Sequence, residues 1–230
     1  EISECLVGSE MCIRDRQMID SLKNGIFETL YMVVMSTAFA YIIGIPLGVA
    51  LYITDKNGIC KNKVVNFILG LITNLIRSIP FLILVVAIIP FTRAVVGTSI
   101  GPGATIVPLV ISAAPFVARM VESSLNEVNQ GVIEAALAMG SSKIQIIFKV
   151  LLPEAKPSLL LGGTITLATV LGYSAMAGFV GGGGLGAIAI NYGYYRYKKD
   201  IMWITVALIV VIVQIFQLAG QGIAKKTDKR

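Results

Sequence analysis

Residues 201–224 read IMWITVALIVVIVQIFQLAGQGIA, a run without a single charged side chain. A helix that crosses the hydrocarbon core of a bilayer needs roughly 20 mostly apolar residues, and this run is long enough. Four more apolar runs precede it, at residues 26–53, 64–96, 104–121 and 159–180. The sequence therefore predicts an all-α membrane protein with five transmembrane helices.

The overall composition favours the same class. Of the 230 residues, 56% are hydrophobic and 14% are charged, whereas soluble domains contain about 25% charged residues. Five membrane helices leave no room for a separate soluble domain. The net charge of +6 is distributed in short clusters between the apolar runs, which indicates membrane topology and not a nucleic-acid surface.

The second apolar run, residues 64–96, is too long for one straight crossing. It is interrupted by Arg77, Ser78 and Pro80. Either it forms a tilted helix, or residues 65–76 lie partly at the membrane interface. An arginine at the bilayer centre costs about 2.5–3.5 kcal/mol on the translocon-insertion scale, so Arg77 should reach a surface or a wet cavity. We expect it near the cytoplasmic side.

The positions of Lys and Arg predict the orientation, because positively charged loops resist translocation. We expect the N-terminus outside and the C-terminus in the cytoplasm, leaving out Arg77 and residues 1–16. The inside segments then hold Lys56, Lys61, Lys63, Arg119, Lys143, Lys149, Lys156, Lys225, Lys226, Lys229 and Arg230. The outside segments hold Lys23, Arg93, Arg196, Lys198 and Lys199. An outer aromatic belt would comprise Tyr192, Tyr194, Tyr195, Tyr197 and Trp203.

The polar segment between the third and fourth runs, residues 122–157, is too regular for a slack linker. The pattern predicts a first short helix over residues 131–139 that stops at Gly140, since glycine readily takes the left-handed conformation at a helix C-terminus. Ser142 and Gln145 have the spacing of a capping box, which predicts the start of a second helix.

In that second helix Ile144, Ile147, Phe148 and Leu151 fall on one apolar stripe. We expect Pro153 to end the helix. A cytoplasmic helix pair with such a stripe needs a packing partner, which is either the membrane part of the same chain or another subunit.

The spacing within this loop resembles the EAA signature of ABC-importer permeases, EAAxxxG, nine residues, then IxLP. Here the signature residues are Glu134, Ala135, Ala136, Gly140, Leu152 and Pro153, with Val150 in place of the usual isoleucine. The resemblance implies a coupling helix that sits in a groove on an ATPase subunit. Glu134 would face a basic residue of that subunit, Ala135 and Ala136 would allow close approach, and Gly140 would make the turn.

Three longer stretches resemble the methionine branch of these type I importers. They are NLIRSIPFLILVVAIIPFTRAVVGTSIG (74–101), APFVARMVE (114–122) and GYSAMAGFVGGGGLG (172–186). The resemblance implies a permease subunit in the bacterial inner membrane that takes up methionine, in its D and L forms. It also implies a homodimeric pore, two cytoplasmic ATPase subunits that hold ATP and magnesium, and an external substrate-binding lipoprotein.

The first residues do not fit this pattern. Residues 1–16, EISECLVGSEMCIRDR, resemble the peptide that sequencing-adapter bases encode when they are translated in frame. We expect them to be a non-native leader and residues 17–230 to form a single ABC-importer transmembrane domain.

Two groups of residues are candidates for the translocation path or its gate. The first is Tyr173, Ser174 and Met176 in the fourth run, which the resembling family uses to line its path. The second is Arg77, Ser78 and Pro80 in the second run. For both groups, packing alone is the alternative role.

Several other functions are disfavoured. The GxGxxG pattern at Gly181, Gly183 and Gly186 has no βαβ context, so a flexible outer loop or a tight helix contact is the better interpretation. No P-loop, no His and no mid-span carboxylate occur, so we expect no enzyme activity and no cofactor in this chain. An ion-coupled carrier or channel for another small amino acid or solute remains the alternative, and an intramembrane enzyme with a Ser-Lys pair is a third.

Overall fold

The computed structural model describes the backbone of residues 2–56 and 58–227 and the side chains of residues 17–56 and 58–227. Every regular element in this part of the chain is a helix. The expected non-native leader, residues 1–16, lies outside the residues whose side chains are described.

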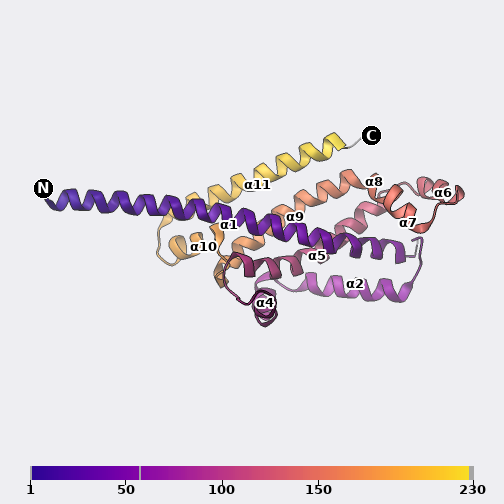
Figure 1. Cartoon of the computed structure of the whole chain (residues 1–230), viewed down its shortest axis with the longest axis horizontal. Coiled ribbons are helices and arrows are strands. Elements are labelled where there is room, and N and C mark those ends of the chain that lie inside the picture. Colours follow the sequence, from indigo (N-terminus) through magenta and orange to yellow (C-terminus); the bar gives the residue numbers. More distant parts are fainter. Residues whose placement is uncertain (1, 57, 228–230) are drawn as a thin grey trace.

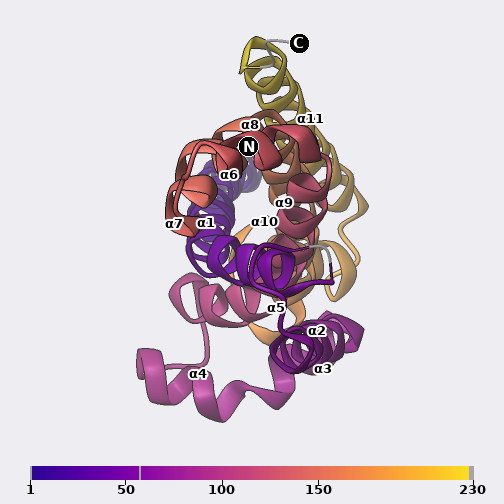
Figure 2. The same ribbon diagram turned by 90° about the vertical axis from the view of Figure 1, so that its right-hand side faces the viewer.

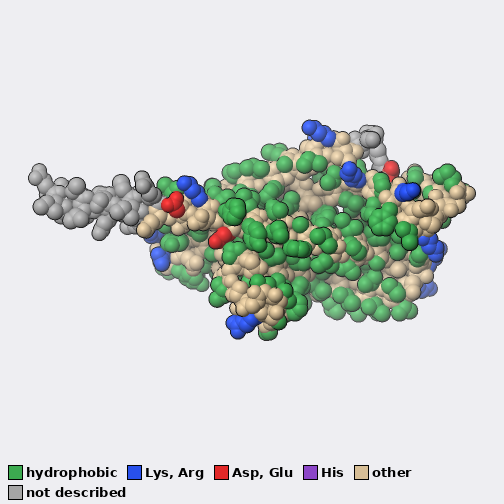
Figure 3. Space-filling model, in the orientation of Figure 1, with side chains coloured by type: hydrophobic (Ala, Val, Ile, Leu, Met, Phe, Trp, Pro, Cys, Tyr) green, Lys and Arg blue, Asp and Glu red, His purple; other side chains and the backbone are tan. Residues whose placement is uncertain are grey.

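Four long helices lie roughly along one axis (Figure 1). They are α1 (Ile2–Thr54), α5 (Pro102–Asn126), α9 (Lys156–Ala177) and α11 (Lys199–Thr227). Each contains a segment long and apolar enough to cross a membrane. Hydrophobic side chains cover most of the middle of the face shown in Figure 3, and charged side chains gather toward its two ends. The predicted class, an all-α membrane protein, is confirmed.

The second apolar run forms three helices, so the first of the two expected alternatives, one tilted helix, is wrong. The other, in which residues 65–76 lie partly at the membrane interface, stays a prediction. They are α2 (Lys63–Ser78), α3 (Phe81–Ala87) and α4 (Ile89–Val96). Pro80 disfavours helical geometry at the preceding residue, and Ile79 is accordingly extended, with ψ of 124°. The α2 and α3 axes differ in direction by 101°, and five candidate spans result if this bent pair counts as one.

Arg77 lies at the end of α2 that is farther from the predicted coupling loop. α2 begins beside the end of α1, near the loop, and runs away from it (Figure 1). Arg77 is in its last turn, 14 residues after Lys63 and therefore about 21 Å along the helix. Arg77 therefore lies next to the bend, about four turns from the start of α2, and its expected position near the cytoplasmic side stays a prediction.

The core of the bundle lies between α1 and α5. Met32 and Val33 of α1 and Leu109 of α5 are almost completely buried. Small residues let the two helices approach closely. A Cβ atom built on Gly44 would lie 2.6 Å from Val117 Cβ, and one on Gly48 would lie 2.5 Å from the carbonyl oxygen of Ala118.

Figure 2, seen from the end that carries the predicted loop, shows α2, α3 and α4 on one side of the bundle and α11 on the other. At the opposite end of the molecule, short helical segments join α9 to α11. They are η2 (Gly178–Val180), α10 (Gly184–Ile188) and η3 (Ala189–Tyr194). Tyr194, Tyr195, Tyr197 and Trp203, members of the expected aromatic belt, are exposed in this region.

Candidate functional site

The first helix of the predicted loop, α6 (Gln130–Ala138), begins and ends with local signals. The side chain of Asn129 accepts a hydrogen bond from the Gly131 N–H, at 2.8 Å. After the helix, Gly140 has φ of +79°, which glycine adopts without steric cost. The predicted stop at Gly140 is confirmed.

The second helix starts at the predicted capping box. The Ser142 N–H donates to Gln145 Oε1 at 2.9 Å, and the Gln145 N–H donates to Ser142 Oγ at 3.3 Å. The chain then forms α7 (Lys143–Ile146), the π-helical segment η1 (Ile147–Leu151) and α8 (Leu152–Glu154). The expectation that Pro153 ends the helix is wrong. Pro153 lies in the first turn of α8, a position where a missing N–H is tolerated.

The predicted apolar stripe is divided between two faces. Leu151 is fully buried, together with Ile146, whereas Ile144 is 68% exposed and Phe148 is 66% exposed. Ile147 to Leu151 are π-helical, so this part of the helix does not follow the 3.6-residue period on which the predicted stripe was based. One face of this helix therefore packs on the chain itself, and the other presents Ile144 and Phe148 outward.

The signature residues of the loop have different surroundings. Ala136 is 3% exposed and packs with Ile133 in the core, while Glu134, Ala135 and Gly140 are exposed. Leu152 is half-buried and Pro153 is exposed. The loop thus offers an outer surface of mixed apolar and charged character, to which Leu137 and Met139 and the exposed Lys143 and Lys149 also contribute.

The gate candidates on α9 point in three directions. The Tyr173 ring stacks on the Phe81 ring of α3, with centroids 4.7 Å apart and an angle of 8° between the planes. Ser174 is 2% exposed and donates a hydrogen bond to the carbonyl oxygen of Leu171. Met176 is 46% exposed on the outer face of the helix. Only Met176 and Tyr173 are accessible from outside the core.

The candidates of the second run lie around the α2–α3 bend. Ser78 Oγ donates to the carbonyl oxygen of Asn74 at 2.8 Å, and the Arg77 side chain is exposed. Pro80 immediately precedes α3. Since Phe81 follows Pro80 and contacts Tyr173, the structure brings the bend next to one of the α9 candidates.

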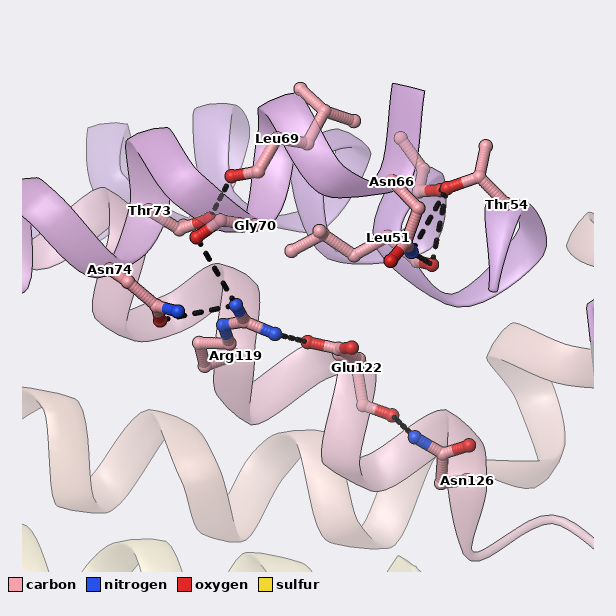
Figure 4. Close-up of polar contacts among 11 residues, drawn as sticks. Leu51, Thr54, Asn66, Leu69, Gly70, Thr73, Asn74, Arg119, Glu122 and Asn126 are labelled. Carbon is pink, nitrogen blue, oxygen red and sulfur yellow. Dashed lines mark hydrogen bonds and ion pairs between the residues drawn. The ribbon is translucent and has the colours of Figure 1, made fainter. Parts of the chain in front are cut away.

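Arg119, expected only as one of the charges that set the topology, contacts α2 (Figure 4). Its Nη1 lies 2.7 Å from Glu122 Oε2, and its Nη2 donates to the Gly70 carbonyl oxygen at 3.3 Å and to Asn74 Oδ1 at 3.1 Å. The sequence signal for a structural role of Arg119 was an arginine in an apolar run with a carboxylate three residues later. It predicts an ion pair, but not the contact with α2.

Glu28 has a structural role that the sequence did not indicate either. It accepts a hydrogen bond from the Gly184 N–H at the start of α10, at 2.7 Å. The glycine-rich segment beside it forms a tight helix contact, since a Cβ on Gly186, the last glycine of the pattern, would collide with the backbone of Ala175. This favours the tight-contact interpretation of the GxGxxG pattern.

Comparison with known proteins identifies the class. Residues 44–229 match the family described as binding-protein-dependent transport system inner membrane component, and the chain belongs to that family. It is 53% identical, over 92% of its length and 94% of the relative, to the probable D-methionine transport system permease protein MetI of Vibrio cholerae. It is 45% identical to the methionine import system permease protein MetP of Bacillus subtilis, over 92% of this chain and 96% of that protein.

Solved structures agree with the sequence comparisons. A chain of the MetNI methionine ABC transporter in an inward-facing conformation superposes with a TM-score of 0.91 and 49% identity. The match covers 93% of this chain and 99% of that one. A chain of an amino acid ABC transporter, 18% identical, shares the fold with a TM-score of 0.76.

Proposed function

We propose that this chain is the permease subunit of an ATP-driven importer of methionine in its D and L forms. The observation that carries the proposal is the superposition on a MetNI chain, at 49% identity over nearly the whole of that chain. In this role the chain forms the translocation path and has no chemistry of its own. Two copies form the pore, two cytoplasmic ATPase subunits bind ATP and magnesium, and a substrate-binding lipoprotein delivers the substrate.

The coupling surface in this proposal is the loop that contains Glu134, Ala135, Ala136, Gly140, Leu152 and Pro153. It is supported by the exposed apolar side chains Ile144 and Phe148, which the chain itself leaves uncovered. Binding of a partner to a cytoplasmic apolar surface of this kind is favourable, because it removes apolar area from water. With the loop in the cytoplasm, the N-terminus lies outside and the C-terminus inside.

The path in this proposal runs along the outer face of α9, with Met176 and Tyr173 as its gate candidates. The α2–α3 bend at Arg77, Ser78 and Pro80 supports one side of that gate through Phe81. Ser174 would act only through packing, because it faces the core.

The test of the proposed function is transport by the reconstituted complex. The chain and its ATPase are incorporated into proteoliposomes with the binding protein, and uptake of labelled methionine is measured with and without ATP. We expect ATP-dependent uptake that unlabelled methionine abolishes and other amino acids do not. Uptake by the permease alone, driven by an ion gradient, would instead support the carrier alternative.

A matched pair of substitutions tests the coupling surface. Phe148 in the loop is 66% exposed and Phe67 on α2 is 69% exposed. We expect Phe148→Ser to weaken co-purification with the ATPase and to lower ATP-dependent uptake, and Phe67→Ser to leave both unchanged. Equal effects of the two variants would contradict the assignment of the loop as the ATPase contact.

A further inference from the structure

Arg119 connects the helix that leads into the coupling loop to a helix at the edge of the bundle. It lies on α5, seven residues before the end of that helix at Asn126, and α6 starts only four residues later, at Gln130. Its guanidinium reaches α2 at two acceptors, the Gly70 carbonyl oxygen and Asn74 Oδ1 (Figure 4).

The position of α2 in the bundle depends mainly on its polar contacts. Thr73 is its only buried residue among those described, and Phe67, Leu71 and Leu75 are exposed. In a membrane, an exposed apolar face gains little by moving from lipid to another helix, so hydrogen bonds and close packing decide how helices associate. α2 has two such polar attachments to other long helices, through Asn66 to α1 and through Asn74 and Gly70 to α5.

The two attachments lie at different points along α2. Asn66 Nδ2 donates to the Leu51 carbonyl oxygen at 2.8 Å and to Thr54 Oγ1 at 3.2 Å, near the start of the helix. The contact of Asn74 with Arg119 is two turns further on, one turn before the bend. The position of α3 therefore depends more on the second attachment than on the first.

Beyond the bend, α3 reaches the candidate gate. Phe81 is 6% exposed and stacks on Tyr173 of α9. The contacts thus form a continuous series from the loop through α5, Arg119, α2 and α3 to Tyr173. Glu122 lies outside this series, because it pairs with Arg119 from the same helix.

We propose that Arg119 is a positioning residue for transport, which fixes α2 on α5 and so holds the Phe81–Tyr173 stack in register with the coupling loop. This inference rests on the proposed function. The guanidinium suits this role because it presents several N–H donors in a planar fork, and one nitrogen can serve α2 while another pairs with Glu122. Movement of the loop that α5 transmits would then reach the gate through α2.

The test compares Asn74→Leu with Asn66→Leu, the same change at the two attachments of α2. Uptake per ATP hydrolysed is measured in proteoliposomes, together with hydrogen–deuterium exchange of the α3 amides. For Asn74→Leu we expect uptake per ATP to fall by about fivefold or more, the lower end of typical coupling effects. Exchange in α3 should become faster. Asn66→Leu should change the thermal stability but neither of these two quantities by more than about twofold.

Two conservative variants separate the contact with α2 from the ion pair. Asn74→Asp keeps an acceptor for Arg119 and should retain the wild-type uptake per ATP hydrolysed. Glu122→Gln removes the ion pair but leaves the α2 contact, and should also retain it. If Asn74→Leu fails to assemble, Arg119→Lys replaces it, because a single ammonium cannot serve Glu122 and α2 in the same geometry. This variant should lower uptake per ATP.

The proposal is overturned if Asn74→Leu, or Arg119→Lys in its place, keeps the wild-type uptake per ATP hydrolysed and the wild-type hydrogen–deuterium exchange of the α3 amides. It is also overturned if Asn66→Leu has the same effect on both, since general loosening of α2 would then explain the result. The exchange measurement needs no transport. A wild-type complex without ATP-dependent uptake would therefore refute the proposed function, while the positioning of α3 by Arg119 could still be judged from the exchange.

Discussion

Glu28 on α1 accepts a hydrogen bond from the backbone N–H of Gly184, with 2.7 Å between the carboxylate oxygen and the nitrogen. The next residue, Thr29, accepts one from the Leu185 N–H at 2.9 Å. These side chains satisfy two N–H groups at the start of α10 that have no partner within that helix. They attach the glycine-rich segment after α9 to α1, 156 residues away in the sequence.

We expect Glu28→Ala to destabilise the protein by about 1.5–3 kcal/mol, because it leaves an amide at the α10 start without its charged acceptor. Glu28→Gln retains an oxygen acceptor and should lose less. The measurement is thermal unfolding of the purified protein in detergent. Asp20→Ala is the control, since the ion pair of Asp20 with Lys23 is exposed and surface pairs contribute little. An equal loss in Asp20→Ala would show that the effect is one of charge and not of the hydrogen bond.

The glycines of the segment from α9 to α10 should differ sharply in their tolerance of alanine. A methyl group on Gly178 would lie 2.5 Å from the Ala187 nitrogen, and one on Gly186 would collide with the backbone of Ala175. We expect Gly178→Ala and Gly186→Ala to cost about 1–3 kcal/mol each, as overpacked sites do. The readout is the amount of folded protein in the membrane and its melting temperature.

The control for these variants is Gly172→Ala in α9, where a Cβ atom would meet nothing within 4 Å. In a helix interior alanine is favoured over glycine by roughly 0.5–1 kcal/mol, so this variant should be neutral or stabilised. If Gly172→Ala destabilised the protein as much as Gly186→Ala, close packing could not be the reason for the glycines.

The coupling loop was largely predictable because its signals are local. Gly140, Ser142 and Gln145 each act within a few residues, and the structure contains the predicted helix stop and capping box. The division of the apolar stripe was not predictable in this way. Periodicity assumes 3.6 residues per turn throughout, whereas the turn after Ile146 is π-helical.

The contacts of the candidate gate join residues that are far apart in the chain, so local sequence patterns predict them less well. Pro80 predicts an interruption, but not the 101° bend or the contact of Phe81 with Tyr173. Asn74 lies 45 residues from Arg119 in the sequence, and nothing in their local patterns indicates that they meet. The methionine resemblance identified the family, but single contacts of this kind required the three-dimensional structure.

Substitutions of Gly140 should be limited by the backbone conformation at this position and not by a lack of space for a side chain. Its φ is +79°, and a Cβ atom would meet nothing within 4 Å. A β-carbon in this conformation costs roughly 1–2 kcal/mol, whereas asparagine tolerates it better. We therefore expect Gly140→Val to lower uptake per ATP in the reconstituted complex and Gly140→Asn to stay close to the wild type. A wild-type ratio in Gly140→Val would mean that the left-handed turn is not needed for coupling.

The stack of Phe81 on Tyr173 should stabilise the contact of α3 with α9 by more than the burial of the two rings. A parallel pair with centroids 4.7 Å apart is expected to contribute about 0.5–1.5 kcal/mol of interaction energy in addition to the effect of the buried ring area. A double-mutant cycle with Phe81→Leu and Tyr173→Leu, followed by unfolding of the purified protein, measures this quantity directly.

The exposed pair Tyr194 and Tyr195 is the control for this cycle. Its rings are tilted by 57° and its side chains are 60% and 59% exposed, so the corresponding double-leucine cycle should give an interaction energy near zero. Tyr173→Phe, which retains the stack, should keep both the stability and the uptake of the wild type. If Tyr173→Phe lost uptake while its stability was unchanged, the hydroxyl group and not the ring would be the part of Tyr173 that serves transport.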